Sequence, residues 1–179
     1  MKYLDKERDI KRIHILGISG SGKSYLAKKL SSLLKINSFD LDDIFWLKKY
    51  TKKRAINSRK KKLKRLTSKR KWIIEGVYST WVDDSISKAD LVILLESSPN
   101  ILSWRIFKRY ILRGKNRESL KDMYKLIKFA RSYRKKEGHY YKYKSLLNKN
   151  KVSYIYLRGK KDIELFLREI VNKYWSVKP

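Results

Sequence analysis

The sequence predicts an α/β fold of three layers, in which a five-stranded parallel sheet lies between helices and carries a helical lid. Apolar segments of strand length alternate with helical segments along the 179 residues, and the first of them runs into a glycine-rich loop. Hydrophobic residues make up 42% of the chain and aromatic residues 13%, which is typical of a packed globular protein. This length suits one domain, so we expect a single domain over residues 1–179.

The first predicted strand, residues 12–16, leads into a loop that matches the phosphate-binding pattern G-x-x-x-x-G-K-[ST] at every fixed position. The glycines of this pattern permit backbone dihedrals that a side chain would forbid, so successive N–H groups can point toward an anion. We therefore predict that ATP is bound by the loop and the residue after it, which are Gly17, Ser19, Gly20, Ser21, Gly22, Lys23, Ser24 and Tyr25.

A helix should follow the loop, because leucines recur on one helical face from Leu26 to Leu34. Its N-terminus would aim the positive end of the helix dipole at the same anion. Lys23 is expected to project outward from the start of this helix and to act as a catalytic charge on the outer phosphates. The hydroxyl of Ser24 is a predicted ligand of Mg²⁺.

An acidic segment, which contains Asp40, Asp42 and Asp43, ends the second predicted strand. Three carboxylates near a phosphate-binding loop are unexpected in so basic a chain. We predict that Asp42 is catalytic and either holds Mg²⁺ through water or orients an acceptor hydroxyl. The structural alternative is that Asp42 or Asp43 caps the N-terminus of a short helix, and the two roles are compatible.

Residues 48–71 contain 14 lysine or arginine residues and no acidic residue. A thin apolar stripe, formed by Ile56, Leu63 and Leu66, predicts a solvated helical segment here. We predict that residues of about 43–71 form a basic flap over an anionic acceptor. The alternatives are an ordinary solvated surface and a track for nucleic acid.

Two further predicted strands, residues 72–76 and 90–96, each carry a carboxylate near the C-terminal end, Glu75 in the first and Glu96 in the second. This edge of a parallel sheet, beside a phosphate-binding loop, is the expected place for a group that organises Mg²⁺ or the acceptor. We assign Glu75 to catalysis and, with Ser24, to the metal. Glu96 competes for the metal role, and the sequence does not decide between the two.

Arginines recur one turn apart on the predicted helix that follows Pro99, and a turn at 114–117 leads to a second helical pattern. Like charges on one helical stripe repel each other, and a bound polyphosphate would reverse that effect. We predict that residues of about 105–135 form a lid. Each arginine of the lid would bind two phosphate oxygens at once, through its planar guanidinium. The alternative is that they face solvent. The predicted catalytic arginines are Arg105, Arg109, Arg131 and Arg134.

The last predicted strand, residues 152–157, is ended by Gly159. Apolar residues from Ile163 to Tyr174 then define a final amphipathic helix against the sheet. The loop at 158–160 is expected to flank an adenine.

The formal charge of +30, from 47 basic and 17 acidic residues, attracts polyanions such as nucleic acid, anionic lipid or polyphosphate substrates. A compositional bias of the source genome would produce the same charge. Tyrosines between Tyr133 and Tyr143 alternate with basic residues. They either stack on the bases of a single strand or pack at half-buried helix positions.

Several kinds of site are disfavoured by composition. The chain has no cysteine, which removes disulfides and thiolate metal sites and suits a reducing cytoplasm. It has two histidines, His14 and His139, too few for a typical zinc site, and His14 is expected to pack within the first strand. The N-terminal residues lack the apolar core of a signal peptide, and no window approaches 18 consecutive apolar residues. We therefore expect a cytoplasmic monomer with no membrane partner.

These motifs resemble those of the adenylate-kinase-like P-loop NTPases, in particular the group known as DNA topology modulation proteins (FlaR-like). The resemblance covers nearly the whole chain and rests on Gly17 to Ser24, Leu41, Asp42, Phe45, Trp46, Trp72 to Gly76, Tyr78, Ser79, Ala89, Asp90, Pro99, Arg105, Arg109, Arg117, Arg131 and Arg134. It implies a nucleoside monophosphate kinase-like fold with ATP and Mg²⁺ as cofactors. Members usually carry Asp, Asn and Asp where this chain has Glu75, Val77 and Glu96, so a shared acceptor is not implied.

Two functions are compatible with these residues. In the first, the chain is a phosphotransferase that moves the γ-phosphoryl group of ATP to a nucleotide or another small-molecule acceptor. In the second, it is a nucleic-acid-binding NTPase involved in DNA topology modulation, and its basic surface binds DNA or RNA, at least non-specifically. The arginine stripe and Asp42 favour the first function, whereas the net charge and the family resemblance favour the second. We favour the kinase, whose acceptor the sequence does not name.

Overall fold

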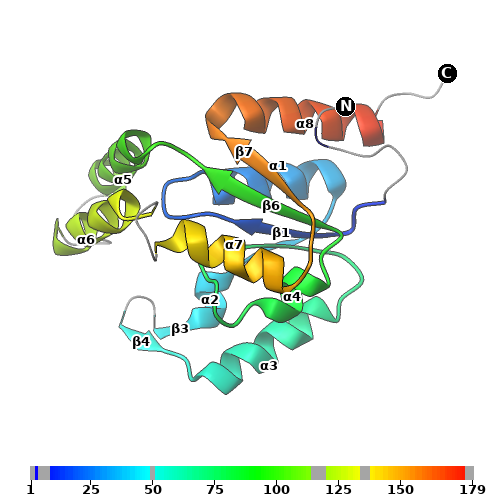
Figure 1. Cartoon of the computed structure of the whole chain (residues 1–179), viewed down its shortest axis with the longest axis horizontal. Helices are drawn as coiled ribbons and strands as arrows, with labels where there is room; N and C mark the ends of the chain where they lie inside the picture. The colour runs from blue at the N-terminus through cyan, green and yellow to red at the C-terminus, as the bar shows by residue number, and fades with distance from the viewer. Residues whose placement is uncertain (1–2, 4–8, 49–50, 114–119, 134–137, 176–179) are drawn as a thin grey trace.

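Five parallel strands form one sheet, in the order β2-β5-β1-β6-β7, in this computed structural model, which describes residues 3, 9–48, 51–113, 120–133 and 138–175 (Figure 1). The predicted five-stranded parallel sheet is therefore confirmed. The first and third predicted strands match the observed ones residue for residue. The strands are β1 (Arg12–Leu16), β2 (Ser38–Asp40), β5 (Trp72–Gly76), β6 (Leu91–Glu96) and β7 (Tyr154–Arg158).

Helices cover both faces of the sheet and complete three layers (Figure 1). On one face, α1 (Lys23–Leu34) and α8 (Gly159–Trp175) pack apolar side chains such as Leu30 and Phe166 against the strands. The other face is covered by α2 (Leu41–Phe45), α3 (Ile56–Thr67), α4 (Asp83–Ser87) and α7 (His139–Lys149). Two further helices, α5 (Pro99–Arg113) and α6 (Leu120–Arg131), pack on each other and project from one side.

The pattern of burial explains why these strands occupy the centre. Successive side chains of a strand point to opposite faces, and in β1 the side chain of Ile15 belongs to the core under α1, whereas that of Leu16 belongs to the opposite core. All residues of β5 and β6 are buried, as expected for parallel strands with helices on both sides. Among the described residues, no helix is long and apolar enough to cross a membrane.

The basic segment differs from its predicted form. A helical segment was predicted over 48–71, but the helix is confined to α3, and a small antiparallel hairpin of β3 (Trp46–Lys48) and β4 (Lys52–Lys53) precedes it. The second strand is also shorter than predicted, because the chain enters α2 at Leu41. Gly159, expected only to end the last strand, is the first residue of α8 and has a φ of +74°.

The tyrosines between 133 and 143 serve mainly for packing. Tyr133 and Tyr143 are almost fully buried in the core, where their rings contact each other, and the hydroxyl of Tyr143 donates to the carbonyl of Val77 at 2.9 Å. Tyr140 packs edge-on against Tyr133, and Tyr141 is exposed. The packing alternative is therefore correct for the two buried tyrosines, and a role in stacking is restricted to the others.

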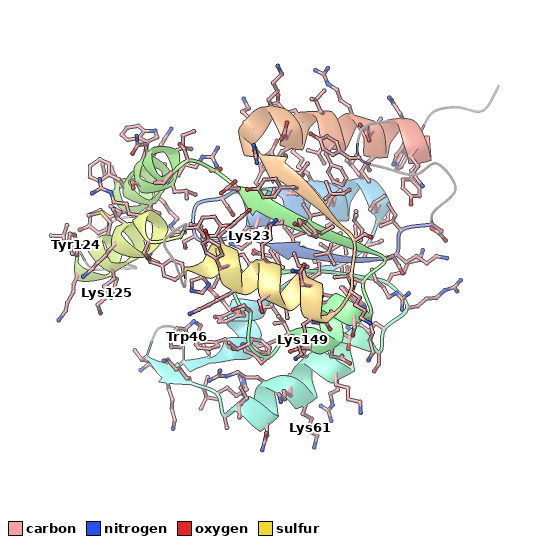
Figure 2. All side chains as sticks on the ribbon, viewed as in Figure 1. Lys23, Trp46, Lys61, Tyr124, Lys125 and Lys149 are labelled. Atoms are coloured by element: carbon pink, nitrogen blue, oxygen red, sulfur yellow. The ribbon has the colours of Figure 1, made fainter. Side chains whose placement is uncertain are left out.

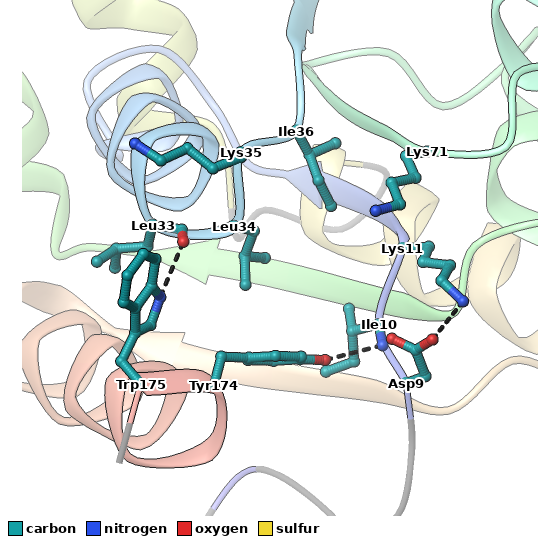
Figure 3. Close-up of a pocket in the computed structure, with 10 residues that line it drawn as sticks. All are labelled: Asp9, Ile10, Lys11, Leu33, Leu34, Lys35, Ile36, Lys71, Tyr174 and Trp175. Carbon is teal, nitrogen blue, oxygen red and sulfur yellow. Dashed lines mark hydrogen bonds and ion pairs between the residues drawn. The ribbon is translucent and has the colours of Figure 1, made fainter. Parts of the chain in front are cut away.

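The N-terminal end of the sheet is held by the last turn of α8. A cavity of about 240 Å³ lies there, where the hydroxyl of Tyr174 accepts a hydrogen bond from the N–H of Ile10 and the indole of Trp175 donates to the carbonyl of Leu33, both at 2.9 Å (Figure 3). These contacts join the ends of three segments that are far apart in the sequence. We assign this end of the sheet to stability.

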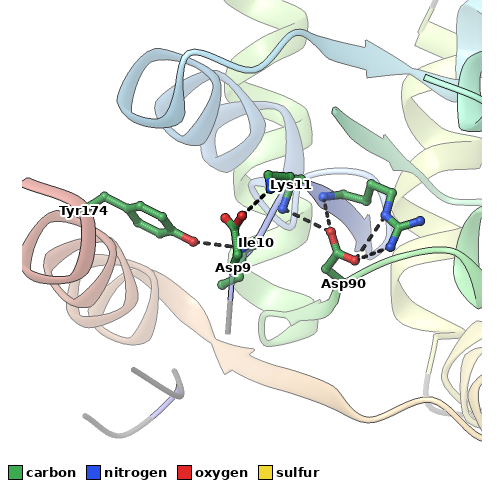
Figure 4. Close-up of polar contacts among 6 residues, drawn as sticks. Asp9, Ile10, Lys11, Asp90 and Tyr174 are labelled. Carbon is green, nitrogen blue, oxygen red and sulfur yellow. Dashed lines mark hydrogen bonds and ion pairs between the residues drawn. The ribbon is translucent and has the colours of Figure 1, made fainter. Parts of the chain in front are cut away.

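Asp90 fixes the start of β6 against β1. It accepts hydrogen bonds from the N–H groups of Lys11 and Arg12 and from the Arg12 guanidinium, at distances of 2.5 to 3.1 Å (Figure 4). Partial burial acts to raise the pKa of Asp90, but the hydrogen bonds from Arg12 and the backbone outweigh it and lower the pKa. Asp90 therefore has a structural role at the start of β6.

Candidate functional site

A cleft of about 1320 Å³ opens at the C-terminal ends of the strands. Its walls come from the phosphate-binding loop, the ends of β2 and β5, the hairpin, the pair α5 and α6, and the start of α8. The cleft is lined by Ser19, Gly20, Gly22, Lys23, Ser24, Tyr25, Asp40, Asp42, Phe45, Trp46, Lys53, Glu75, Gly76, Val77, Tyr78, Arg105, Arg109, Lys125, Leu126, Phe129, Lys160, Ile163 and Glu164. Most of the predicted nucleotide-binding residues are thus part of one concave site.

The loop has the backbone geometry that its glycines predict. Gly20 and Gly22 have φ values of +81° and +104°, in the left-handed region that favours glycine. At Gly17 a Cβ atom would lie 2.7 Å from the hydroxyl of Ser21, so a side chain has no room there. The Arg105 guanidinium donates to the carbonyls of Gly20 and Ser21, at 3.1 and 3.4 Å, and so ties α5 to the loop.

Lys23 is buried, contrary to the prediction that it projects outward. Only 8% of the residue is exposed, and its Nζ donates to the carbonyl of Ile18 at 3.2 Å and lies 3.8 Å from a carboxylate oxygen of Glu75. The difference arises because neighbouring segments close around the start of α1. Burial lowers the pKa of Lys23, and the carboxylates, of which Glu75 is the strongest, act in the opposite direction. The charge is nevertheless on the lining of the cleft.

Ser24 and Glu75, the predicted metal residues, are brought together. The Ser24 hydroxyl donates to Oε1 of Glu75 at 2.5 Å, although 51 residues separate them. Ser24 stands in the first turn of α1 and Glu75 at the end of β5, the neighbour of β1 in the sheet. Their oxygens line the same part of the cleft as Lys23.

Asp40, for which no catalytic role was predicted, lies beside this pair. It is the register partner of Glu75 across β2 and β5 and lines the cleft. Burial first, and then the charge of Glu75, raise the pKa of Asp40 to about 6. Asp40 also caps α2, since Oδ1 accepts from the N–H of Asp42 at 2.9 Å, so the expectation that Asp42 or Asp43 is the cap was wrong. The acidic segment itself was the sequence signal for this residue.

Asp42 lies in the cleft and is held by Tyr78. The Tyr78 hydroxyl donates to Oδ1 of Asp42 at 2.6 Å. Burial, together with this hydrogen bond and the carboxylate charge, raises the pKa of Tyr78, so the phenol stays protonated and keeps donating. The second oxygen of Asp42 accepts no hydrogen bond that we observe among the described residues. This position suits a group that orients an acceptor hydroxyl.

Glu96 occupies a different environment. The hydroxyl of Tyr156 donates to its Oε2, and the Arg158 guanidinium lies 4.0 Å from the same oxygen. Glu96 is the last residue of β6, and Glu75 is the second-last residue of β5. Despite these similar positions, Glu96 is not part of the lining of the cleft.

The predicted arginines divide into two groups. Arg105 and Arg109 on α5 line the cleft, and the charge of Arg109 is one cause of the lowered pKa of Lys23. Arg131 is exposed at the end of α6 and does not contribute to the lining that the described residues form. Arg134 and the predicted turn at 114–117 lie outside the described residues.

Aromatic residues, which the sequence did not single out for function, line the part of the cleft toward the hairpin. The rings of Phe45 and Tyr78 stack with centroids 4.6 Å apart, and Trp46 packs edge-on against Phe45. Phe129 of α6 lines the cleft too. Figure 2 shows Lys23 inside the molecule, whereas Trp46 lies at the start of the hairpin. Lys160 also lines the cleft, but it lies in the first turn of α8, and the loop predicted at 158–160 is the junction between β7 and α8.

The chemistry of the donor set fits Mg²⁺ held together with a nucleotide. Among the described residues there is no group of three or more histidine, cysteine or acidic residues placed to hold a metal ion. A hydroxyl and a carboxylate, Ser24 and Glu75, with Asp40 beside them, are hard oxygen donors. Mg²⁺ at such sites keeps several waters and takes its remaining ligands from phosphates.

Sequence comparison identifies one uncharacterised relative. No protein-family model matches the chain. The chain is 44% identical over 105 residues to the uncharacterised protein YqaC of Bacillus subtilis (strain 168). The match covers 56% of this chain and 59% of that protein, so it spans less than two thirds of the relative's length.

Comparison with solved structures identifies the fold. The chain is similar to a gluconokinase from Sinorhizobium meliloti 1021, with a TM-score of 0.57, 13% identity and 93% of each chain covered. It is also similar to the shikimate kinases of Bacteroides thetaiotaomicron (TM-score 0.53, 16% identity, 92% of this chain and 98% of that one) and Acinetobacter baumannii (0.52, 15%, 92% and 93%). The finer resemblance to DNA topology modulation proteins rests on none of these matches and stays a prediction. At this level of identity the likeness concerns the fold, and the chain has the P-loop kinase fold.

Proposed function

We propose that this chain is an ATP-dependent phosphotransferase, which moves the γ-phosphoryl group of ATP to a hydroxyl of a small-molecule acceptor. The observation that carries the proposal is the convergence of Lys23, Ser24 and Glu75 within hydrogen-bond or ion-pair distance, beside a phosphate-binding loop, on the lining of one large cleft. The main requirement of phosphoryl transfer is a set of positively charged and hydrogen-bonding groups held in fixed positions around the transferred group.

In this proposal the phosphates lie on the loop and against Lys23. Mg²⁺ would be held by the Ser24 hydroxyl and, directly or through water, by Glu75, and it would neutralise charge on the phosphate oxygens. The hydrogen bond between Ser24 and Glu75 keeps both oxygens in place. Arg105 and Arg109 add positive charge from α5. Helices α5 and α6 would form the lid, and the segment from α2 to α3 the flap.

The acceptor would occupy the part of the cleft between Asp42 and the hairpin. Asp42 is oriented by the Tyr78 hydroxyl and is the candidate for positioning the acceptor hydroxyl and accepting its proton. Lys53 and Lys125 line the same cleft and would attract an anionic acceptor. The solved structures similar in fold are kinases of shikimate and gluconate by their descriptions, which supports a small-molecule acceptor.

The remaining parts of the proposal follow from composition. We propose a monomer that works in a reducing cytoplasm, because the chain has no cysteine and a large net charge that opposes self-association.

A screen of acceptors by ³¹P NMR tests this function. Wild type is incubated with ATP and Mg²⁺ and, in turn, with nucleoside monophosphates, shikimate, gluconate and other hydroxy compounds. We expect a new phosphate ester and ADP with at least one acceptor. Lys23→Met, which keeps the length of the side chain, should abolish transfer. Equal ADP release without any acceptor, or equal ATP affinity and turnover in Lys23→Met, would contradict the proposal.

The nucleic-acid alternative is supported by the exposed basic residues of α3, such as Lys60, Lys61 and Lys62. A salt titration of oligonucleotide binding separates it from the kinase. Binding that falls steeply with salt and ignores ATP is expected of a merely basic surface. Binding that survives about 200 mM salt, depends on ATP and is lost in Tyr140→Ala/Tyr141→Ala would favour the alternative.

A further inference from the structure

The outer face of α5 exposes a row of large apolar side chains. On a helix with about 3.6 residues per turn, Ile101, Trp104, Ile111 and Leu112 fall on one continuous face. Trp104 is 61% exposed and Leu112 74%, and the ring of Phe107 lies 6.2 Å from that of Trp104. Large apolar side chains that are exposed together on one helix face mark a surface that binds a partner or a membrane.

The helix that packs on α5, α6, also begins with exposed apolar side chains. Leu120 and Tyr124, in the first turns of α6, are 62% and 67% exposed. Helices α5 and α6 pack on each other. Tyr124 points away from the body at the outer side of α6 (Figure 2). We call the seven residues Ile101, Trp104, Phe107, Ile111, Leu112, Leu120 and Tyr124 the outer patch.

The proposed reaction does not use the outer patch. The opposite face of α5 carries Leu102 and Ile106 into the core and Arg105 and Arg109 into the cleft. A nucleotide bound in the cleft would therefore contact the inner face of α5 and leave the outer patch exposed. These apolar side chains can therefore be buried only by contact with another molecule.

Within the two helices as the structure describes them, the charged residues are nearly all basic. Asp122, the acidic residue of the two helices, lies 3.7 Å from Lys125 in an ion pair. Where exposure is described, the exposed basic residues of the two helices are Lys108, Lys121, Lys125, Lys128 and Arg131, of which Lys125 also lines the cleft. Apolar side chains flanked by lysines on a helix pair are the combination that inserts into the headgroup region of an anionic bilayer.

Two other occupants fit less well. A second copy of the chain would bring one +30 charge against another, with the same basic surroundings on both sides. Nucleic acid would be attracted by the lysines, but Ile111 and Leu112 gain nothing by contact with phosphates. We propose that the outer patch is a peripheral membrane-binding surface, which inserts its apolar side chains among anionic lipid headgroups. The sequence analysis had expected no membrane partner.

Vesicle flotation with a charge-neutral variant tests the proposal. Wild type should bind vesicles that contain about 30% phosphatidylglycerol at least about tenfold more tightly than pure phosphatidylcholine vesicles. Ile111→Ser/Leu112→Ser/Tyr124→Ser keeps every charge and changes only exposed positions, so the protein should fold normally, as circular dichroism would verify. This variant should lose about tenfold or more of its affinity for the anionic vesicles.

Three controls distinguish insertion from other causes. The matched variant Leu165→Ser/Val171→Ser, at exposed apolar positions of α8, should bind vesicles as wild type does. Tryptophan emission should shift to shorter wavelength with vesicles, and Trp104→Phe should reduce the shift. Binding to a single-stranded oligonucleotide should not differ between wild type and the triple variant. The proposal would be overturned if the triple variant bound vesicles as wild type does, or if wild type did not bind vesicles at low salt. It would also be overturned if wild type were a dimer and the triple variant a monomer.

Discussion

Two carboxylates stand near the ends of the two strands that flank β1, and their register partners on the next strand carry opposite charges. Glu75 on β5 lies beside another carboxylate, Asp40, its register partner on β2. Glu96 on β6 lies beside a guanidinium, that of Arg158, its register partner on β7. Each carboxylate has a cation nearby, Lys23 at 3.8 Å from Glu75 and Arg158 at 4.0 Å from Glu96, but Lys23 also faces the charges of Asp40 and Asp42.

Under the proposed function, this comparison favours one of the two carboxylates for the metal, although both stand near the end of a strand. Two acidic groups close together favour the binding of a cation, because each disfavours the ionised form of the other until a positive charge arrives. A carboxylate next to an arginine has less to gain from Mg²⁺. The neighbours across the sheet therefore favour Glu75 over Glu96.

The largest effect should come from exchanging one carboxylate at a time for its amide. We expect Glu75→Gln to lower kcat by about 100-fold or more, with a small change in ATP affinity, because the amide cannot organise the metal. Glu96→Gln should stay within about threefold of wild type. Steady-state kinetics on the acceptor found in the screen, with ATP affinity by calorimetry, measures both. A mild Glu75→Gln with a severe Glu96→Gln would reverse the assignment.

The strand between the two carboxylates, β1, contains a buried histidine that should make the stability of the fold depend on pH. His14 is fully buried on β1, neither ring nitrogen has a hydrogen-bond partner among the described residues, and burial lowers its pKa to about 3. Below its unfolded pKa of 6.5 the unfolded chain takes up a proton that the folded chain refuses, so stability falls as the pH falls from 6.5. The loss at pH 5 should be about 2 kcal/mol.

His14→Leu isolates this contribution. Urea unfolding at pH 7 and pH 5 should show that the difference in stability between the two pH values shrinks by about 2 kcal/mol in the variant. His139, whose pKa is also lowered by burial, is unchanged and contributes equally to both proteins. An unchanged pH dependence in the variant would show that His14 is not held neutral in the folded state.

Asp40 offers a smaller test of the crowded carboxylate side. Burial and Glu75 raise its pKa from 3.8 to about 6, so the folded chain holds a proton that the unfolded chain releases between these values, and stability falls as the pH rises through this range. Asp40→Asn removes the charge and keeps an oxygen for the cap of α2. Without Mg²⁺, its Tm should exceed that of wild type by about 2–4 °C at pH 7 and match it at pH 4, in scanning calorimetry.

The smallest effect is expected on the Glu96 side. Tyr156→Phe removes the hydroxyl that donates to Glu96 and should cost about 1 kcal/mol of stability, because a buried carboxylate oxygen loses one hydrogen bond. Turnover should be unchanged. Chemical denaturation and kinetics on the same preparation measure the two quantities. A loss of turnover beyond the loss of folded protein would connect Glu96 to the site after all.

What could be predicted from the sequence depends on local patterns. The glycines of the phosphate-binding loop and the apolar strands β1 and β5 are such patterns, and they were located residue for residue. Ser24 and Glu75 followed from them, since a loop after one strand and the end of its neighbour meet at the same edge of a parallel sheet.

Other features depend on contacts between distant segments. Asp40 is beside Glu75 only because of the register between β2 and β5, which no pattern in either strand specifies. Lys23 is buried by segments that come later in the chain. The hairpin β3–β4 has short, exposed, lysine-rich strands without the alternation that identifies strands in sequences.

The two hydrogen bonds from Arg105 to the carbonyls of Gly20 and Ser21 have a consequence for the entropy of binding. A loop rich in glycine would otherwise lose much conformational freedom when an anion orders it. Here a side chain about 85 positions away along the chain already restrains the loop before any anion arrives. Because a peptide group is planar, fixing the carbonyl of Ser21 also fixes the direction of the Gly22 N–H. The loop is thus preorganised, and a larger share of each phosphate contact is available as affinity.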